Sequence, residues 1–456
     1  MSYRILNPAT NEVEREFESV SADEIEAAIA AAHEEFERWS VEPLDARIQI
    51  IKKVAQLYRE RADELAEIIA REMGKPIAFG RGEVGISADI FDYYADNAEV
   101  FLADEELTIA SGGRAVVRTA PLGVLLGIMP WNYPYYQVAR FAAPNLILGN
   151  TILLKHASNC PESAAAIAQI FADAGLPSGA YINLYVSSRD VPSIIGDDRV
   201  RGVSLTGSEA AGRAVGEAAG RYLKKCVLEL GGSDPFLVFS TDNLDATVKG
   251  AVLGRMANGG QACNSSKRAI VVDDLYDEFV EKYVARMRRI QAGDPMDDGT
   301  RFGPLSSEAA VDEILEIVDD AVAKGATLHC GGKRIEREGA WMEVTVLTDV
   351  TPEMRAYREE IFGPVGVIYR VANEDEAVRL ANDSPFGLGS SVVTTDAEQA
   401  ERVANALQAG MVFFNAPGDS EPDLPFGGVK ASGIGRELGR YGIDEFANKK
   451  VLRWQA

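Results

Sequence analysis

The chain has 456 residues, of which 46% are hydrophobic and 25% charged, and its formal net charge at pH 7 is −24. This length allows a large core and two or three domains, whereas the negative charge argues against nucleic acid or an anionic membrane surface as partners, because like charges repel. No run approaches the ~18 apolar residues that a membrane span needs, and residues 1–8 hold no apolar signal core, so we expect a cytoplasmic protein.

The first part of the chain is predicted to be mainly helical. Ser21 and Glu24 have the spacing of a capping box just before an alanine-rich run. Helices are predicted over residues 25–39, 44–73 and 82–102, and the second of these stops at Gly74-Lys75-Pro76. Short strands bounded by glycine and proline are then expected at 114–118 and 123–128.

From residue 151 onward, strands and helices alternate. Strands are predicted at residues 151–155, 182–186, 203–205 and 225–230, with helices at 161–174 and 210–222. A run of βαβ units predicts a mostly parallel, doubly wound sheet. Nucleotides bind at the carboxyl ends of the strands in such a sheet.

A second alternating block extends from about Pro235 to Phe414. Its strands are predicted at 236–239, 268–272, 365–369 and 390–394, and its helices at 246–257, 275–289, 308–324, 374–382 and 397–407. The sequence therefore predicts an α/β fold with two doubly wound domains that meet near Gly231-Gly232. Active sites favour such an interface between domains.

Two glycine-flanked motifs lie at this predicted boundary. Glu229 opens Glu-Leu-Gly-Gly, and Cys263, 34 residues later, closes Gly-Gln-Ala-Cys. A thiolate can add to a carbonyl carbon, a carboxylate can activate water, and glycine lets a second backbone approach closely. The pair indicates covalent chemistry on an aldehyde or acyl carbon. The alternative for either motif alone is a buried cysteine or a surface glutamate near a turn.

Cysteine and histidine usage gives no support for a metal site or a disulfide framework. The three histidines are too few for a His-rich site, and no CxxC pattern occurs among the four cysteines, Cys160, Cys226, Cys263 and Cys330. We expect a reduced protein without a metal. The acidic residues are spread through helices, and we interpret the net charge as adaptation to a salt-rich cytoplasm, with an ordinary acidic enzyme as the alternative.

Other motifs are weak signals when each is taken alone. Gly207 and Ser208 follow a predicted strand and open a helix, where backbone amides can face a phosphate, or where the chain simply turns. Lys155 ends a strand and could reach a ribose or phosphate. Asn132 lies in the rigid pentapeptide Pro-Trp-Asn-Tyr-Pro and could donate to an oxyanion, or could be a buried amide in a packed turn. Residues 360–364 and 425–433 are Gly/Pro loops.

In this order and spacing the motifs resemble those of the NAD(P)-dependent aldehyde dehydrogenase superfamily, and the resemblance covers essentially the whole chain. It rests on Glu-Leu-Gly-Gly, Gly-Gln-Ala-Cys and Glu-Ile-Phe-Gly-Pro, whose glutamate, Glu360, falls 97 residues after Cys263. The resemblance implies that Cys263 is the nucleophile, that the Asn132 side chain and the Cys263 N–H form the oxyanion hole, and that Glu229 is the general base. The residues that it implies for cofactor binding are Trp131, Lys155, Gly207, Ser208, Glu360 and Phe362.

The implied reaction is consistent with these residue types. A Cys263 thiohemiacetal loses a hydride to NAD or NADP, and water activated by Glu229 hydrolyses the resulting thioester. An ordinary thiol has a pKa near ~8.5, so either its setting lowers that value or a base takes the proton. NAD-preferring members usually carry a glutamate three residues after Lys155, where this chain has Ser158. A serine tolerates a 2′-phosphate, so we predict that NADP is accepted as a cofactor.

Arg140, eight residues after Asn132, resembles the arginine with which succinate-semialdehyde dehydrogenases clamp the substrate carboxylate. The second clamp arginine of other branches is absent, because Ala257 occupies its position and Arg255 lies two residues earlier. Ser420 is a further candidate for a substrate contact. The alternative for Arg140 is a structural salt bridge.

We therefore expect NAD(P)-dependent oxidation of a small, carboxylate-bearing aldehyde, with succinate semialdehyde first. The alternatives are a broad aliphatic or betaine-type aldehyde dehydrogenase, a CoA-acylating enzyme, for which Glu229 would be superfluous, and a catalytically silent binding protein on the same fold.

The resemblance also implies a small β element for subunit contacts. Its expected parts are residues 108–121 and a C-terminal strand at 446–456, beside a dinucleotide-binding domain at 1–107 and 122–229 and a catalytic domain at 230–430. Alternating apolar residues such as Val451 and Trp454 fit an edge strand that needs covering. A homodimer or homotetramer follows from this implication.

Overall fold

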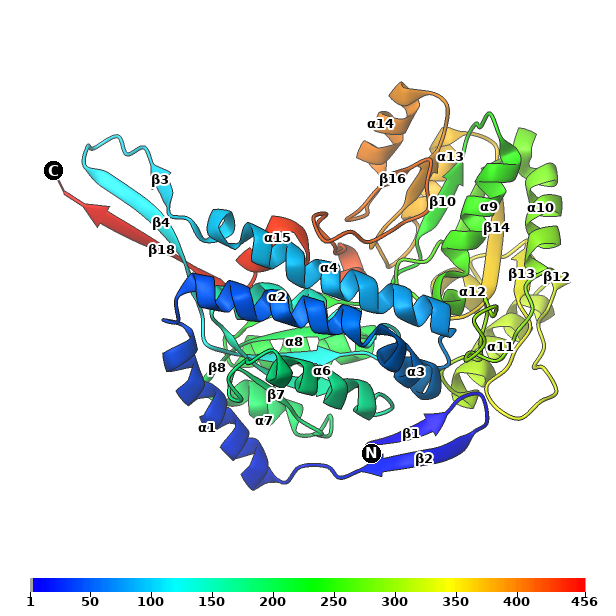
Figure 1. The fold of residues 1–456 in the computed structure, drawn as a ribbon. Helices are drawn as coiled ribbons and strands as arrows, with labels where there is room; N and C mark the ends of the chain where they lie inside the picture. Colours follow the sequence, from blue (N-terminus) through cyan, green and yellow to red (C-terminus); the bar gives the residue numbers. More distant parts are fainter. Residues whose placement is uncertain (1–2, 456) are drawn as a thin grey trace.

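In the computed structural model, which describes residues 3–455, two large sheets with helices around them form the body of the molecule (Figure 1). Residues 1, 2 and 456, which end the predicted ranges 1–107 and 446–456, lie outside the described residues. The α-helices are α1 Ala22–Trp39, α2 Leu44–Glu60, α3 Ala62–Met73, α4 Ile77–Leu102, α5 Tyr136–Leu148, α6 Pro161–Asp173, α7 Val191–Gly196, α8 Glu209–Arg221, α9 Leu244–Arg255, α10 Asp273–Met287, α11 Glu308–Ala323, α12 Arg355–Arg358, α13 Glu374–Asn382, α14 Ala397–Ala406 and α15 Gly439–Asp444.

The first large sheet is doubly wound, as predicted. Its order over the described residues is β17-β9-β8-β5-β6-β7, and all neighbouring pairs are parallel except β17 with β9. The strands are β5 Val124–Met129, β6 Thr151–His156, β7 Tyr181–Asn183, β8 Val200–Thr206, β9 Lys225–Glu229 and β17 Gly433–Ile434. The strand order reverses between β5 and β8, which is the point where ligands bind in open α/β sheets.

The second large sheet is also mostly parallel. Its order is β12-β13-β14-β11-β10-β15-β16, with β12 antiparallel to β13 at one edge. The strands are β10 Pro235–Val238, β11 Arg268–Val272, β12 Thr327–Cys330, β13 Thr345–Thr348, β14 Val365–Val371, β15 Ser391–Val393 and β16 Phe413–Phe414. The chain passes from the first sheet to the second between Glu229 and Pro235, at Glu-Leu-Gly-Gly.

The N-terminal helices follow their sequence signals, with one correction. Ser21 and Glu24 form the expected capping box at the start of α1. The single helix predicted over 44–73 is instead two helices, α2 and α3, because Arg61 leaves the helical conformation with φ −106° and ψ 18°. No glycine or proline marks this break, so periodicity alone runs through it. A β1–β2 hairpin, Tyr3–Asn7 with Glu12–Phe17, also lacked a prediction.

Helix α5, directly after the Pro-Trp-Asn-Tyr-Pro segment, was not predicted either. All of its residues are buried, so the helix has no polar face to set a 3.6-residue period. It packs against α4 and against the first sheet. Its N-terminus therefore lies at the carboxyl end of β5, where the site is built.

A three-stranded antiparallel sheet projects from the body of the molecule (Figure 1). Its order is β18-β4-β3, with β3 Glu105–Leu107, β4 Arg114–Pro121 and β18 Ala447–Trp454. The expected range of 108–121 contains β4 but misses β3, which lies entirely before it, within the range predicted for the dinucleotide-binding domain. Val451 and Trp454 of the edge strand β18 are 62% and 45% exposed.

The carboxyl edge of the first large sheet faces the amino edge of the second. The segments of the first sheet that carry predicted site residues follow the carboxyl ends of β5, β6, β8 and β9. In the second sheet Ser233, Lys267 and Glu360 precede the amino ends of β10, β11 and β14, which are neighbouring strands. The site is therefore assembled where these two edges face each other.

Candidate functional site

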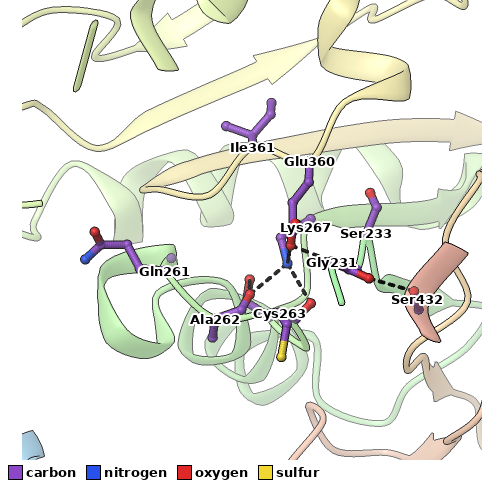
Figure 2. Close-up of polar contacts among 12 residues, drawn as sticks. Gly231, Ser233, Gln261, Ala262, Cys263, Lys267, Glu360, Ile361 and Ser432 are labelled. Atoms are coloured by element: carbon purple, nitrogen blue, oxygen red, sulfur yellow. Dashed lines mark hydrogen bonds and ion pairs between the residues drawn. The ribbon is translucent and has the colours of Figure 1, made fainter. Parts of the chain in front are cut away.

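Cys263 lies in the turn between a short 3-10 helix, Ala257–Gly260, and β11. Its side chain is half-buried. The main-chain carbonyls of Ala262 and Cys263 both accept hydrogen bonds from Lys267 Nζ, each at 2.7 Å (Figure 2). The main chain of the turn that carries the sulfur is thus held by one buried ammonium group.

The two glycines of Glu-Leu-Gly-Gly allow other motifs to approach. A Cβ at Gly232 would collide with the main-chain oxygen of Cys263, and one at Gly231 would collide with the carboxylate of Glu360. The carbonyl of Gly231 accepts from the hydroxyl of Ser432 at 2.7 Å, which brings the loop at residues 425–433 to the same place. The predicted need for close approach at these glycines is confirmed.

Asn132 lies beside the Cys263 turn at the carboxyl end of β5. Its side-chain Nδ2 donates to the carbonyl of Gln261 at 3.1 Å, and its own carbonyl accepts from Asn258 Nδ2 at 2.9 Å. An amide has two N–H groups, so one remains for a ligand. The structure thus brings Asn132 and the Cys263 segment together, as the predicted oxyanion hole requires.

A buried ion pair supports the Asn132 segment. Lys75 and Glu83 pair with side chains that are each 1% exposed. Lys75 Nζ also donates to the carbonyl of Asn132 at 2.8 Å, and Glu83 Oε1 accepts from the backbone amides of Tyr135 and Tyr136 at 2.9 and 3.3 Å. Glu83 therefore caps the N-terminus of α5, and the pair fixes the loop from both sides.

Glu229 ends β9 and is 2% exposed. Within residues 3–455, neither of its carboxylate oxygens has a hydrogen-bond partner. A Cβ at Gly427 would lie 2.6 Å from Glu229 Oε1, so this glycine leaves room for the carboxylate. Burial raises the pKa of Glu229 well above its usual range, and the charge of Arg140 opposes that rise. A carboxyl with a raised pKa suits a general base that works near neutral pH.

The thiol of Cys263 is not ionised by its surroundings. Burial raises its pKa to about 12, and the charges of Arg140 and Lys267 act in the opposite direction without overcoming it. Of the two routes to a thiolate that the sequence left open, a lowered pKa and removal of the proton by a base, the structure favours the second.

The predicted cofactor residues of the first sheet line its carboxyl edge. Gly207 and Ser208 follow β8, and the Ser208 hydroxyl caps α8 by accepting from Ala211 N at 3.3 Å. Lys155 Nζ contacts the carbonyl of His156 at 3.3 Å, and burial lowers the pKa of this lysine. Ser158 is half-buried two residues beyond β6, and its carbonyl accepts from Arg4 N at 3.0 Å.

The remaining cofactor residues form a second group. The rings of Trp131 and Phe362 pack edge to face with centroids 5.8 Å apart. Glu360 Oε1 accepts from Gly232 N at 3.1 Å and pairs with Lys267 at 3.0 Å, whereas its other oxygen makes no hydrogen bond within residues 3–455. A lysine ammonium with one hydrogen bond to a carbonyl, a helix N-terminus and a carboxylate with one available oxygen fit a nicotinamide dinucleotide.

Arg140 lies on α5 and is fully buried. Its Nε forms an ion pair with Glu437, and its other nitrogens lie 3.5 Å from the Tyr136 hydroxyl and 3.3 Å from the Thr206 hydroxyl. Its guanidinium also stacks 4.3 Å from the centroid of Phe426. Burial works to lower the pKa of Arg140, but Glu437 and its other partners raise it above the ordinary value, so the group stays charged.

Ser420 reaches the same place through Tyr136. Burial raises the pKa of the Tyr136 phenol, while the charge of Arg140 and a hydrogen bond with Ser420 lower it. The structure therefore brings the two predicted substrate residues to one tyrosine hydroxyl. Arg255 does not replace the second clamp arginine that is missing at Ala257. Its guanidinium donates to the carbonyls of Val365 and Ile361 at 2.6 and 2.8 Å and so holds the segment before β14.

Sequence reasoning missed five residues of the site. Tyr136 and Glu437 surround Arg140, Lys267 joins Cys263 to Glu360, and Lys75 and Glu83 hold the Asn132 loop. Lys267 stands directly before β11, next to Arg268, and no glycine or proline motif singles it out from other lysines. Tyr136 was within reach of sequence reasoning, since it lies four residues before Arg140 and therefore on the same helix face.

Within residues 3–455, no cluster of three or more His, Cys, Asp or Glu side chains could hold a metal ion. Among the helices described, none combines the length and the apolar character that crossing a bilayer requires.

Comparison with known proteins gives consistent matches over the whole chain. The aldehyde dehydrogenase family matches residues 1–452. A succinate-semialdehyde dehydrogenase [NADP(+)] of Deinococcus radiodurans is 52% identical over 451 residues, which cover 99% of this chain and 94% of that protein. A succinate-semialdehyde dehydrogenase [NADP(+)] 1 of Mycobacterium tuberculosis is 47% identical over 454 residues, 99% of both chains.

Solved structures agree with this match. The structure of succinic semialdehyde dehydrogenase from Streptococcus pyogenes, in complex with NADP+ as the cofactor, superimposes with a TM-score of 0.97 at 41% identity and 99% coverage of both chains. A second structure, described as giving insights into cofactor and substrate selection by Gox0499, has a TM-score of 0.98 at 44% identity and 100% coverage of both chains.

Proposed function

Because this chain belongs to the aldehyde dehydrogenase family, we propose that it oxidises succinate semialdehyde to succinate with NADP. The observation that carries the choice of substrate is Arg140, a fully buried guanidinium that stays charged and whose field acts on both Cys263 and Glu229. A carboxylate at the far end of a short aldehyde would find its countercharge there. The names of the two relatives, which are 52% and 47% identical to this chain, support the same substrate and cofactor.

The proposed roles follow from the geometry. A base takes the proton of the Cys263 thiol, Sγ forms a bond to the aldehyde carbon as the C=O π bond opens, and the resulting oxyanion accepts from the Asn132 amide and the Cys263 N–H. NADP, when bound, supplies the acceptor for the hydride. Glu229 then takes a proton from water, whose oxygen attacks the thioester carbon, and the C–S bond breaks to release the acid and restore the thiolate.

The residues for the cofactor divide by the part of the dinucleotide that each would hold. Lys155 and Ser158 would face the adenosine ribose and its 2′-phosphate, and Gly207 with Ser208 the pyrophosphate at the N-terminus of α8. Glu360 would accept from the nicotinamide ribose, with Trp131 and Phe362 around the ring. The serine at 158 supports NADP because it lacks the negative charge that would repel a 2′-phosphate.

A second function within the family is favoured by one observation. Glu437 already pairs with Arg140, so the guanidinium has a countercharge without any substrate. If that pairing is purely structural, the enzyme is a broad aliphatic or betaine-type aldehyde dehydrogenase. Tyr136 and Ser420, which meet beside Arg140, favour the carboxylate-bearing substrate, because their hydroxyls can donate to the same anion.

The direct test is the formation of NADPH from succinate semialdehyde, followed by absorbance, with and without coenzyme A. The proposal expects turnover that is independent of coenzyme A and absent in Cys263→Ser. No turnover in the wild type would contradict the proposal and leave a binding protein on this fold. Turnover that requires coenzyme A would indicate acyl transfer in place of hydrolysis by Glu229.

The projecting sheet supports a homodimer or homotetramer. Strand β18 is at the edge of the β18-β4-β3 sheet and exposes Val451 and Trp454, and exposed apolar edge strands are usually covered. We expect the mass in solution, measured by light scattering, to be two or four times the chain mass of 49.2 kDa. Val451→Asp should lower that mass, and an unchanged mass would place the contact elsewhere.

A further inference from the structure

Lys267 uses one ammonium group to join two parts of the site. Its side chain is 3% exposed, and Nζ lies 2.7 Å from the carbonyl oxygens of both Ala262 and Cys263 and 3.0 Å from Glu360 Oε1 (Figure 2). A lysine ammonium has three N–H donors and no acceptor, so these three contacts satisfy it completely. The group therefore has no hydrogen left for solvent or substrate.

Glu360 is fixed at its other contacts as well. The same Oε1 accepts from Gly232 N at 3.1 Å, and the carboxylate packs so closely on Gly231 that no Cβ fits there. Two residues later, Phe362 packs on Trp131, and Lys267 Nζ lies 5.8 Å from the centroid of the Phe362 ring. The position of the Glu360 carboxylate thus depends on Lys267 and on the glycine pair, and both also touch the Cys263 turn.

We propose that Lys267 is a positioning residue that sets the Glu360 carboxylate and the Cys263 main chain in a fixed relation, so that the nicotinamide ribose and the nucleophile are placed by one cation. This inference rests on the proposed function, which gives Glu360 to the ribose and Cys263 to the aldehyde. It goes beyond that function because Lys267 itself contacts neither the aldehyde nor, by its saturated hydrogen bonds, the cofactor.

Charge adds a second effect to this geometry. Lys267 carries a positive charge beside the Cys263 turn, and Glu360 opposes it. The titratable groups that act on the Cys263 thiol are Arg140, Lys267, Glu360, Glu229, Tyr133 and Tyr136. Asp234 faces Lys267 too, and burial raises the pKa of Asp234 to about 7 against the opposing charge of Lys267. Removing the ammonium should therefore make the thiol harder to ionise.

The test uses the full chain with the neutral, similarly shaped variant Lys267→Met and two readouts. The first is the Kd for NADP without aldehyde, measured by tryptophan fluorescence. The second is the rate at which iodoacetamide alkylates Cys263 as a function of pH, followed by mass spectrometry. We expect the Kd to rise at least tenfold and the alkylation profile to move to higher pH. Lys249→Met, an exposed lysine on α9, serves as the matched control and should change neither readout.

A double-mutant cycle with Glu360→Gln separates positioning from a general loss of structure. If Lys267 acts on the cofactor through Glu360, Lys267→Met should change the Kd for NADP little in the Glu360→Gln background, while its effect on alkylation persists. An equal effect of Lys267→Met on the Kd for NADP in both backgrounds, or wild-type values of both readouts in Lys267→Met, would overturn the proposal.

The Glu360→Gln variant and wild-type turnover separate this inference from the proposed function. Glu360→Gln alone should move the alkylation profile of Cys263 to lower pH, since the carboxylate no longer opposes Lys267. If Lys267→Met does not fold, Glu360→Gln tests the proposal by itself. An unchanged alkylation profile in Glu360→Gln would contradict the proposed coupling of Glu360 and Lys267 to Cys263. Failure of the wild type to oxidise any aldehyde would contradict the proposed function, whereas wild-type turnover with an unaffected Lys267→Met would contradict only this inference.

Discussion

The guanidinium of Arg140 and the carboxylate of Glu437 form an ion pair in the interior, with side chains 0% and 6% exposed. Glu437 also accepts from the Ser204 hydroxyl at 3.1 Å, so the pair ties α5 and β8 to the segment before α15. A charge so deeply buried must keep its partner. Arg140 is therefore a structural cation as well as the candidate for binding the substrate carboxylate, and experiments on it have to separate these two roles.

Stability measurements can make that separation. Arg140→Met leaves the Glu437 carboxylate buried without its partner, and we expect a loss of about 3–5 kcal/mol, as is typical when one member of a buried pair is removed. Arg140→Met combined with Glu437→Gln removes both charges and should recover most of the apparent Tm. Thermal unfolding of the two variants checks this. If the double variant is no more stable than the single one, the pair is not what holds the segment.

Glu229→Gln should stop the reaction at the thioester. The variant keeps the size of the side chain but cannot take a proton, and removal of a general base typically costs ~10²–10⁴-fold in rate. We expect one rapid equivalent of NADPH followed by slow turnover, together with an acylated Cys263 visible by mass spectrometry. A variant that turns over at the wild-type rate without a burst would exclude Glu229 as the base.

The same carboxyl gives a pH dependence with a definite sign. Burial raises the pKa of Glu229, so the base is protonated and inactive at low pH and becomes available as the pH rises. Steady-state kcat in the wild type should therefore increase with pH as Glu229 ionises, when hydrolysis limits the rate, and this rise should be absent in Glu229→Gln.

Ser158→Glu should reverse the cofactor preference. The added carboxylate would repel the 2′-phosphate of NADP but could accept from the ribose hydroxyls of NAD. We expect kcat/KM for NADP to fall at least tenfold, or ~1.4 kcal/mol, while that for NAD is kept or improved. Ser158→Ala controls for loss of the hydroxyl and should retain NADP. A wild type that works with NAD but loses activity with NADP would refute the prediction.

The sequence predicted the parts of the fold that carry local signals. The strand–helix alternation gave both large sheets, and Ser21 with Glu24 gave the start of α1. The break at Arg61 escaped because neither glycine nor proline marks it, and α5 escaped because a helix buried on every side shows no amphipathic period. Elements without a local signal were thus the ones that only tertiary packing could define.

The site was predictable to the extent that its motifs are contiguous. Cys263, Glu229, Asn132 and Glu360 each stand in a short glycine- or proline-rich segment, and the structure places these segments at one interface. The partners that hold site residues come from elsewhere in the chain: Glu437 pairs with Arg140, Lys267 with Glu360, and Lys75 donates to the carbonyl of Asn132. Such contacts depend on which strands are neighbours, and neither charge pattern nor periodicity contains that information.

The net charge of −24 leads to a prediction about salt. If the acidic surface is an adaptation to a salt-rich cytoplasm, screening of its self-repulsion should stabilise the fold, since the Debye length falls from ~10 Å at 0.1 M to ~3 Å at 1 M. We expect the apparent Tm to rise steadily between 0.1 and 2 M KCl, with activity retained. A Tm that is flat or falls over this range would identify an ordinary acidic enzyme.

The most direct test of the central claim is the ratio of kcat/KM for succinate semialdehyde to that for butyraldehyde, with NADP, in the wild type and in Arg140→Met. The account predicts that the wild type prefers succinate semialdehyde and that the variant loses ~2 kcal/mol, roughly 30-fold, for this substrate only. An equal fall for both aldehydes, or a wild type that prefers butyraldehyde, would contradict it and leave Arg140 as a structural cation.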